Sequence, residues 1–282
     1  MKAAREEGKT RCTRGRDCIR FALLIGLLVI TSNRVASAAA WQASLTTTRG
    51  DFPDLRPLRA RYVFGWAGIP AASAEVQFTR SSSARFQLQG IGRTVGLARA
   101  LWRLDVNARA SADAETLRPI EVNQREEYRR KTVVTHLNFG ADGVRGTRTE
   151  TKTGGVGDTK AREFRFPNLF DLHSALLFLR SQPLRDHAVY RVVVYPATSA
   201  YLATVTVVGR EKVFVRGGTY NAIKADLQLH RLGKNLDLEP HRKFRRATAW
   251  ISDDPNRILL RIEAQIFIGS VFAELQSVRF EM

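Results

Sequence analysis

The chain has only two cysteines among its 282 residues, Cys12 and Cys18, and both precede its longest apolar run. That run, residues 21–30, has the features of an export signal, so neither thiol is expected in the mature protein. The mature chain then lacks disulfides, cysteine-bound zinc and a cysteine nucleophile. A lipoprotein is also excluded, because its cysteine would have to follow the apolar run.

Long apolar runs are missing as well. Ten residues suit the core of a signal peptide and fall far below the ~20 residues of a membrane-spanning helix. Basic residues precede residues 21–30, and small residues follow them up to Ala40. The pattern predicts a signal peptide over residues 1–38, with cleavage after Ala38 or, as the second choice, after Ala40. We therefore expect a periplasmic protein that keeps no transmembrane anchor after cleavage.

Acidic residues are scarce relative to basic ones. The chain has 27 Asp and Glu against 45 Lys and Arg, a net charge of +18. Removal of residues 1–38 takes away 8 basic and 3 acidic residues and leaves +13. This excess favours anionic partners such as lipids or envelope polymers, and it equally fits charge scattered over a solvated surface. Export and the lack of a nucleic-acid-binding signature argue against nucleic acid.

Alternation of apolar and polar residues recurs through the mature sequence and is typical of antiparallel strands with one wet face. The clearest case is residues 258–268. Residues 39–57 lack periodicity and are predicted to form a flexible leading segment. Residues 58–282 are predicted to form a single mainly β domain, built as one large antiparallel curved sheet or a partly open barrel, because no βαβ pattern is visible.

One short helix is predicted between Asp171 and Ser181. Asp171 suits its N-terminus, and Pro183 ends the pattern. A helix of about three turns is marginal alone, so we expect its apolar stripe to pack on the sheet. The residues of that stripe are Leu172, Ala175, Leu176 and Leu179.

A glycine-rich stretch at Gly90, Gly92 and Gly96 approaches a dinucleotide-binding fingerprint. Its spacing is one residue off, and no second strand–helix unit with an acidic residue follows. We interpret it as a flexible turn and predict no cofactor.

Signatures of catalysis and metal binding are absent from the sequence. It contains no H-E-x-x-H motif and no G-x-S-x-G elbow. Asp253 and Asp254 can be interpreted as a carboxylate pair or as turn formers before Pro255, and we favour the turn. We predict no catalytic residues and no metal site. An enzyme acting on envelope polymers, with a site assembled from distant residues, is the third alternative for function.

Aromatic residues are the best candidates for a binding site. Tyr62, Phe64 and Trp66 alternate along one predicted strand, and Trp250 is a further candidate. Such residues either line an apolar ligand cavity or fill the core.

The order of several short motifs resembles the bacterial exported family known only as domain of unknown function 3108. The resemblance covers about residues 58–280 and is carried by residues 61–72, 114–119, 171–180 and 250–254. It implies one exported β-rich domain of the Gram-negative envelope and supplies no activity. At Ala72 the family usually has another small residue, often Gly. The residues that match family positions of unknown role are Asp171, Arg180, Trp250, Asp253 and Asp254.

Two functions of different classes follow from these features. The first is a binding module for a lipid or another apolar or anionic envelope ligand, with an apolar concave face and arginines at its rim. The alternative is a structural or interaction protein that docks on anionic partners of the envelope.

Overall fold

The computed structural model describes residues 41–81, 84–240, 244–266 and 269–281. The chain divides into two compact units, Met1–Ser44 and Leu45–Met282. Only residues 41–44 of the first unit are described, so the predicted signal peptide and its cleavage sites lie outside the described residues. The fold below is that of the second unit.

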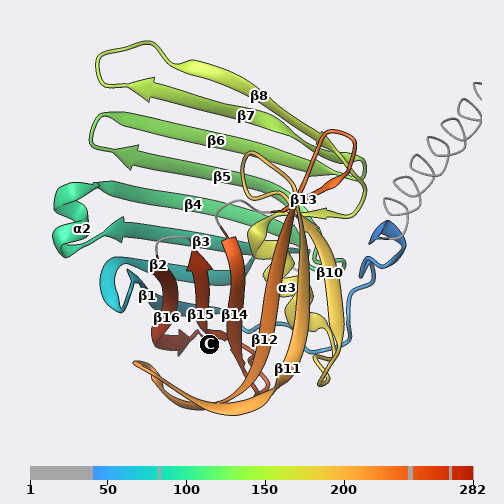
Figure 1. Cartoon of the computed structure of the whole chain (residues 1–282). Coiled ribbons are helices and arrows are strands. Elements are labelled where there is room, and N and C mark those ends of the chain that lie inside the picture. Colours follow the sequence, from blue (N-terminus) through green and yellow to red (C-terminus); the bar gives the residue numbers. More distant parts are fainter. Residues whose placement is uncertain (1–40, 82–83, 241–243, 267–268, 282) are drawn as a thin grey trace, which may run out of the picture. The chain divides into compact units, whose positions relative to one another are not determined.

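Sixteen strands among the described residues form one sheet (Figure 1). The strand order is β8-β7-β6-β5-β4-β3-β2-β1-β16-β15-β14-β12-β11-β10-β9, and β13 pairs with β12. Neighbours are antiparallel except β9 and β10, which are parallel. The strands are β1 (Leu58–Trp66), β2 (Ile69–Ser81), β3 (Arg85–Thr94), β4 (Leu104–Asp113), β5 (Pro119–Tyr128), β6 (Lys131–Gly140), β7 (Gly143–Lys152), β8 (Asp158–Arg165), β9 (Leu169–Phe170), β10 (Val189–Val194), β11 (Tyr201–Val215), β12 (Gly218–Leu232), β13 (Leu238–Pro240), β14 (Phe244–Ser252), β15 (Leu259–Ile266) and β16 (Gly269–Phe280).

Two helices of the second unit are described, α2 (Gly96–Leu101) and α3 (Leu172–Ser181). The predicted fold class, a mainly β chain with one large, largely antiparallel sheet and one short packed helix, is confirmed. Asp171 caps α3 by accepting a hydrogen bond from the Ser174 amide at 2.7 Å. In the described part of the chain, no helix is long and apolar enough to cross a membrane.

The predicted apolar stripe of α3 is confirmed in part, because Ala175 is buried and Leu179 packs against a buried cluster. Leu172 and Leu176 are exposed, whereas Ser174 and Phe178 are buried. The Phe178 ring packs against Phe170 with 4.6 Å between ring centroids. Through Ala175 and Phe178 this face packs on β9 and β10 in one buried cluster.

The sheet has an inner face, on which α3 packs, and a polar outer face. Phe78 and Phe86 point from β2 and β3 toward α3 and join a buried cluster with Leu58, Ala60 and Leu275. Side chains alternate along a strand, so the flanking residues Gln77 and Thr79 of β2 and Gln87 of β3 point to the other face.

Gly90 and Gly92 do not form the predicted turn. Both lie inside β3, paired with β2 on one side and β4 on the other. Pairing on both sides outweighs the low strand propensity of glycine. Only Gly96, with φ of +53°, occupies a bend, where β3 passes into α2.

The leading segment is anchored at several points, although it contains no strand up to residue 57. The Thr46 amide donates to the Arg191 carbonyl at 2.8 Å, and the Phe52 amide donates to that of Ser181 at 3.0 Å. Arg49 donates to the Ala114 carbonyl at 2.7 Å.

Candidate functional site

Along β2 and most of β3, inner-face side chains become smaller and less buried with distance from α3, until Thr94 at the far end of β3, which is buried. Along β2, Phe78 is fully buried, whereas Val76, Ala74 and Ala72 are half-buried. Along β3, the buried Phe86 gives way to Gly90 and Gly92. We call this part of the inner face the open half. It consists of Ala72, Ala74 and Val76 of β2, Gly90 and Gly92 of β3, and Val106 and Ala108 of β4.

The apolar surface continues onto the C-terminal strands. Phe64 of β1 pairs with Ala72 on one side and with Ala273 of β16 on the other. Ala273 pairs with Ile262, which pairs with Ala249. Cross-strand partners share a face of a sheet, so small and apolar residues form a strip from β4 through β1 to β14.

Gly90 marks open space in the middle of this strip. A Cβ added at Gly90 would meet no heavy atom within 4 Å in the part of the chain that the structure describes. At Gly92 the nearest heavy atom, the Ala74 Cβ, is 3.4 Å from an added Cβ. The inner face thus has room beside Gly90 that its own side chains do not fill.

The structure separates the four predicted aromatic residues. Phe64 and Trp66 lie beside the open half, with 39% and 46% of their surface exposed. Tyr62 instead packs against the buried cluster, and its hydroxyl donates to the Leu259 carbonyl at 2.9 Å. Burial raises the pKa of Tyr62 far above its usual value of 10.0.

Trp250 lies on the opposite side of β14 from Ala249. Its Nε1 donates to Glu211 at 2.6 Å, and its ring lies 5.7 Å from the Lys224 ammonium and 5.9 Å from the Arg261 guanidinium. It therefore contacts charged side chains and also packs against the buried cluster that Tyr62 joins, away from the open half.

A half-buried polar network borders the open half on β5, β6 and β7. Glu126 accepts hydrogen bonds from Gln124 at 2.6 Å, Tyr128 at 3.2 Å and Arg148 at 3.4 Å. Arg148 also donates to the Thr135 hydroxyl at 3.0 Å. Because Gln124 pairs with Ala108 across the strands, the network shares the inner face with the apolar strip. An apolar surface thus meets a polar one along the β4–β5 boundary.

Arg180 belongs to a structural contact between three segments. Its guanidinium is buried and donates to the carbonyls of Pro53, Pro255 (3.2 Å) and Asn256 (2.8 Å). Loss of water around it, together with nearby Arg257, lowers the pKa of Arg180 to about 10. Arg180 therefore joins α3 to the leading segment and to the turn between β14 and β15.

The aspartates of that turn also have structural roles. Asp254 accepts hydrogen bonds from the Asn256 amide at 2.8 Å, the Arg257 amide at 3.1 Å and the Ser252 hydroxyl at 3.0 Å. Asp253 accepts one from Arg210 at 3.0 Å. These bonds form an Asx-type turn, as the sequence pattern predicted. Nowhere in the described residues do three or more His, Cys, Asp or Glu side chains gather as metal ligands.

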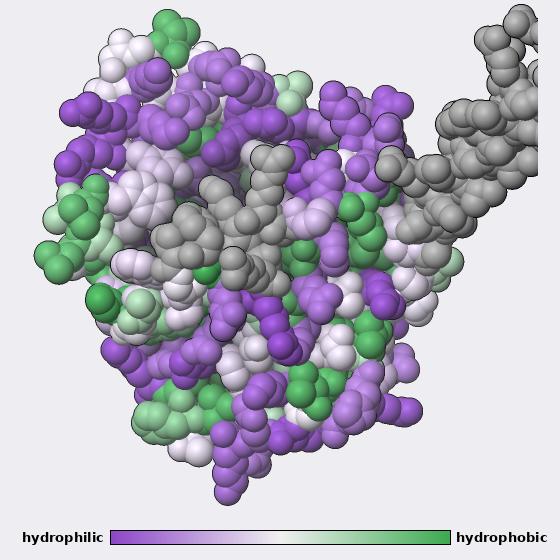
Figure 2. All heavy atoms as spheres, viewed as in Figure 1, coloured by the Kyte–Doolittle hydropathy of each residue, from purple (hydrophilic) through white to green (hydrophobic). Residues whose placement is uncertain are grey.

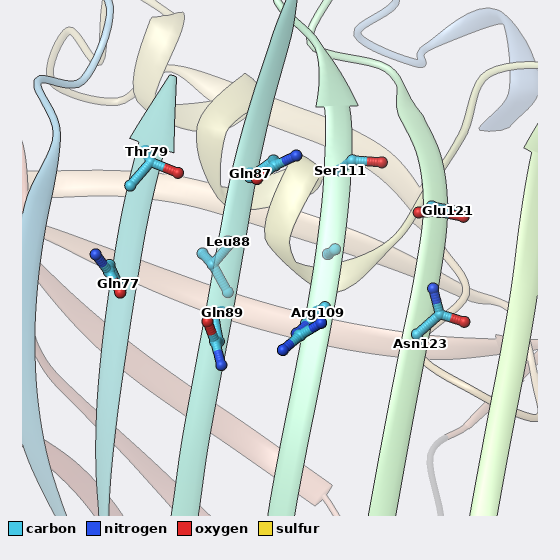
Figure 3. A pocket seen from close by; sticks show the side chains of 10 residues that line it. Gln77, Thr79, Gln87, Leu88, Gln89, Arg109, Ser111, Glu121 and Asn123 are labelled. Atoms are coloured by element: carbon cyan, nitrogen blue, oxygen red, sulfur yellow. The ribbon is translucent and has the colours of Figure 1, made fainter. Parts of the chain in front are cut away.

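The outer face of β2–β5 carries a shallow groove of about 420 Å³ (Figure 3). Its side chains are mostly amides and hydroxyls, with Arg109 and Glu121, and α3 lies behind the sheet in that view. Such a surface is well hydrated and does not suit an apolar chain. Gln89 of this groove and Gly90 of the open half are neighbours in sequence on opposite faces.

Sequence reasoning missed both the open half and the polar network. The signal was present as small residues at alternate positions of three successive strands, at 72, 74, 90, 92 and 108. The sequence alone does not show that these positions are neighbours, because only the strand register places them side by side.

Comparison with known proteins gives a family match and distant structural likenesses. Residues 61–276 match the family described as "Protein of unknown function (DUF3108)". No curated protein matches the chain. A beta-barrel-like protein of domain of unknown function DUF1849 from Brucella abortus is 12% identical, with a TM-score of 0.54 over 81% of this chain and 99% of that chain. This likeness concerns the fold alone.

Two further solved structures resemble the chain weakly. One, described as an exported protein, is from Bacteroides fragilis and is 11% identical, with a TM-score of 0.29 over 82% of this chain and 99% of that one. The other, described as a lipoprotein, is from Parabacteroides distasonis and is 9% identical, with a TM-score of 0.33 over 83% and 100%. Scores this low do not bear on the fold.

Replacement of Arg180 by Met is expected to lower the free energy of unfolding by about 3–5 kcal/mol, because three carbonyls lose a charged donor. Urea unfolding followed by circular dichroism measures the change. Arg185→Met, at an exposed position, is the control and should cost less than about 0.5 kcal/mol. Equal losses in the two variants would contradict the structural role of Arg180.

Tyr62 is expected to make the fold sensitive to alkali. Its pKa is raised in the folded state, so above about pH 10 the unfolded chain loses this proton first and the stability falls with rising pH, by up to about 1.4 kcal/mol per pH unit. Tyr62→Phe should flatten this fall while costing about 1 kcal/mol at neutral pH for the lost hydrogen bond. Urea unfolding over a pH series tests both, and an unchanged alkaline slope would contradict the assignment.

Proposed function

The chain belongs to the DUF3108 family of proteins of unknown function, and on that premise we propose that it is an exported, periplasmic, non-enzymatic protein that binds the apolar chain of a lipid on the open half of its inner face. The observation that carries the proposal is the space beside Gly90. Binding sites for apolar ligands are concave and lined mainly by apolar side chains, with few polar groups at defined places.

The composition of the inner strip supports an acyl chain as the ligand. Its residues are Gly, Ala, Val and Ile, which leave room above the sheet, and Phe64 flanks them. Burial of each CH₂ group of a ligand there gains about 0.8 kcal/mol. The strip spans several strands about 4.8 Å apart, so it can accommodate an extended chain of many carbons.

The polar network beside the strip supports an amphiphile rather than a hydrocarbon. Glu126 and Arg148 are held half-buried by Gln124 and Thr135, so both charges are positioned before any ligand arrives. A lipid whose chain lies along the strip can place polar groups of its head against these side chains. Positioned donors and acceptors of this kind orient a ligand in an otherwise apolar site.

The alternative, a docking protein for anionic partners, rests on the net charge. Several outer-face arginines are paired with carboxylates, such as Arg61 with Glu75 at 2.8 Å and Arg125 with Glu127 at 2.8 Å. Paired and screened charges of this type attract anions weakly. The outer face of the sheet therefore supports the docking function less well than the inner face supports ligand binding.

Gly90→Phe tests the proposed site. The new ring should fill the space on the inner face and weaken binding of cis-parinaric acid, a fluorescent fatty acid, by about tenfold or more. The mature chain, residues 39–282, is titrated and the fluorescence of the acid is measured. Native mass spectrometry of the same proteins from the periplasm should show a stoichiometric lipid on the wild type that is reduced on the variant.

Gln89→Phe is the matched control, because it adds the same ring to the same strand on the outer face. It should leave binding of cis-parinaric acid within about twofold of the wild type. Equal binding by the Gly90→Phe and Gln89→Phe proteins, with both folded by circular dichroism, would refute the open half as the site. A wild-type protein that is empty and binds no fatty acid would refute the lipid-binding function itself and favour the docking alternative.

A further inference from the structure

Exposed apolar side chains gather at the end of the sheet away from α3. The β1–β2 turn, α2, and the β5–β6 and β7–β8 turns all lie along this end, on the left in Figure 1. We call the large apolar residues there the mouth rim. They are Trp66, Ile69, Leu97, Leu101 and Trp102, and each is exposed.

Specific contacts bring the parts of this end together. The Val95 amide donates to the Ala71 carbonyl at 2.9 Å, which ties the start of α2 to β2. Arg129 donates to the Ala100 carbonyl at 2.6 Å, which ties the end of α2 to the β5–β6 turn. The Trp102 and Tyr128 rings lie 6.2 Å apart. The mouth rim is therefore a defined surface and includes residues far apart in sequence.

Helix α2 contributes the most exposed part of the mouth rim. None of its residues is buried, and Leu97 and Leu101, one helical turn apart, are 83% and 86% exposed. Figure 2 shows hydrophobic residues, in green, at the left edge of the molecule, where Figure 1 places α2. Two exposed leucines on one side of a helix are unfavourable in water, and such patches mark interaction surfaces.

Arginines surround the mouth rim. Arg93 and Arg103 are exposed at the ends of β3 and α2, and Arg129 and Arg130 are exposed in the β5–β6 turn. Asp105 forms salt bridges with both Arg99 (2.9 Å) and Arg103 (3.3 Å), so one negative charge there is shared by two positive ones. Cationic side chains beside exposed Leu and Trp match the surface of an anionic bilayer, in which headgroups meet acyl chains.

We infer that the mouth rim inserts into the surface of an anionic bilayer. The open half begins directly behind it, since Trp66 pairs with Ile69 at the turn and Phe64 pairs with Ala72 two residues further in. Docking by the rim would therefore bring the apolar strip to the membrane, where a lipid chain can enter or leave. The inference rests on the proposed function for its purpose, and its test is independent of that function.

Vesicle flotation tests the docking surface. The mature chain, residues 39–282, is mixed with vesicles of phosphatidylcholine containing phosphatidylglycerol and with vesicles of phosphatidylcholine alone. The double variant Leu97→Ser, Leu101→Ser should bind the anionic vesicles at least about tenfold more weakly than the wild type. The double variant Arg93→Ser, Arg130→Ser should lose about fivefold per arginine on anionic vesicles and little on neutral ones.

Matched controls remove the same chemistry elsewhere. Phe214→Ser deletes a side chain that is 75% exposed at the tip of the β11–β12 hairpin. This tip lies at the same end of the sheet as the β14–β15 turn, where the Asp253 amide donates to the Asn221 carbonyl of β12. Arg185→Ser removes an exposed arginine near the C-terminal end of α3. Both should bind vesicles like the wild type. All substituted positions are exposed, and circular dichroism with thermal unfolding confirms that each variant is folded.

The outcomes separate docking from ligand binding. Loss of vesicle binding in the leucine variant, with binding of cis-parinaric acid in solution retained, supports the inference. Vesicle binding by that variant equal to the wild type overturns it, as does a wild type that binds no vesicles. Self-association that disappears in the leucine variant, without vesicle binding, also overturns it and makes the rim a contact between copies. Vesicle binding through the rim by a chain that binds no fatty acid upholds the inference while the proposed function fails.

Discussion

The structure depends on a mismatch between one sheet and one helix. Sixteen strands pair into a single sheet, and its inner face must be covered if it is apolar. The ten residues of α3 cover only part of it, where they pack against β9 and β10 and against the cluster that contains Phe78 and Phe86. Elsewhere on β2 and β3 the chain places Ala and Gly, which expose little apolar surface, and so the sheet tolerates an uncovered region. The candidate site lies on this uncovered part of the inner face.

Arginines that bind backbone carbonyls hold the C-terminal end of α3 in place. Arg180 reaches the leading segment and the β14–β15 turn. Arg257 donates to the carbonyls of Arg180 at 3.0 Å, Gln182 at 2.5 Å and Pro183 at 3.1 Å, all at the C-terminal end of α3. Carbonyls at a helix C-terminus lack partners within the helix, and cations there also interact favourably with its dipole. In the segments 171–180 and 250–254, Arg180 and Asp254 therefore make structural contacts.

Sequence predicted the strands and the helix because both depend on local periodicity. Prediction from the sequence failed where a feature depended on which residues of other strands lie beside it in the folded sheet. Of the predicted stripe of α3, Ala175 is buried whereas Leu172 and Leu176 are exposed, and Phe178, which lay outside the predicted stripe, packs on β9 and β10. Gly90 had the composition of a turn, yet two neighbouring strands held it extended. Of the predicted aromatic residues, Phe64 lies at the candidate site, whereas Trp250 does not, because the strand register decides which side chains share a face.

The two faces of the same strands have opposite chemistry, and this limits what the sheet can bind. On β3, the side chains of Gln87 and Gln89 point outward, beside Arg109. Positions 90 and 92, both glycine, belong to the inner face, next to Ala74 and Ala108. A sheet that needed only to be soluble could carry larger apolar residues inward, where burial would stabilise it by about 25 cal/mol per Å². Glycine in a strand forfeits that stabilisation and adds an entropic cost of roughly 0.5–1 kcal/mol. The stability of the sheet alone gives no reason for two such positions on the inner face, next to the half-buried Glu126 and Arg148, whereas the proposed function uses the space that they leave.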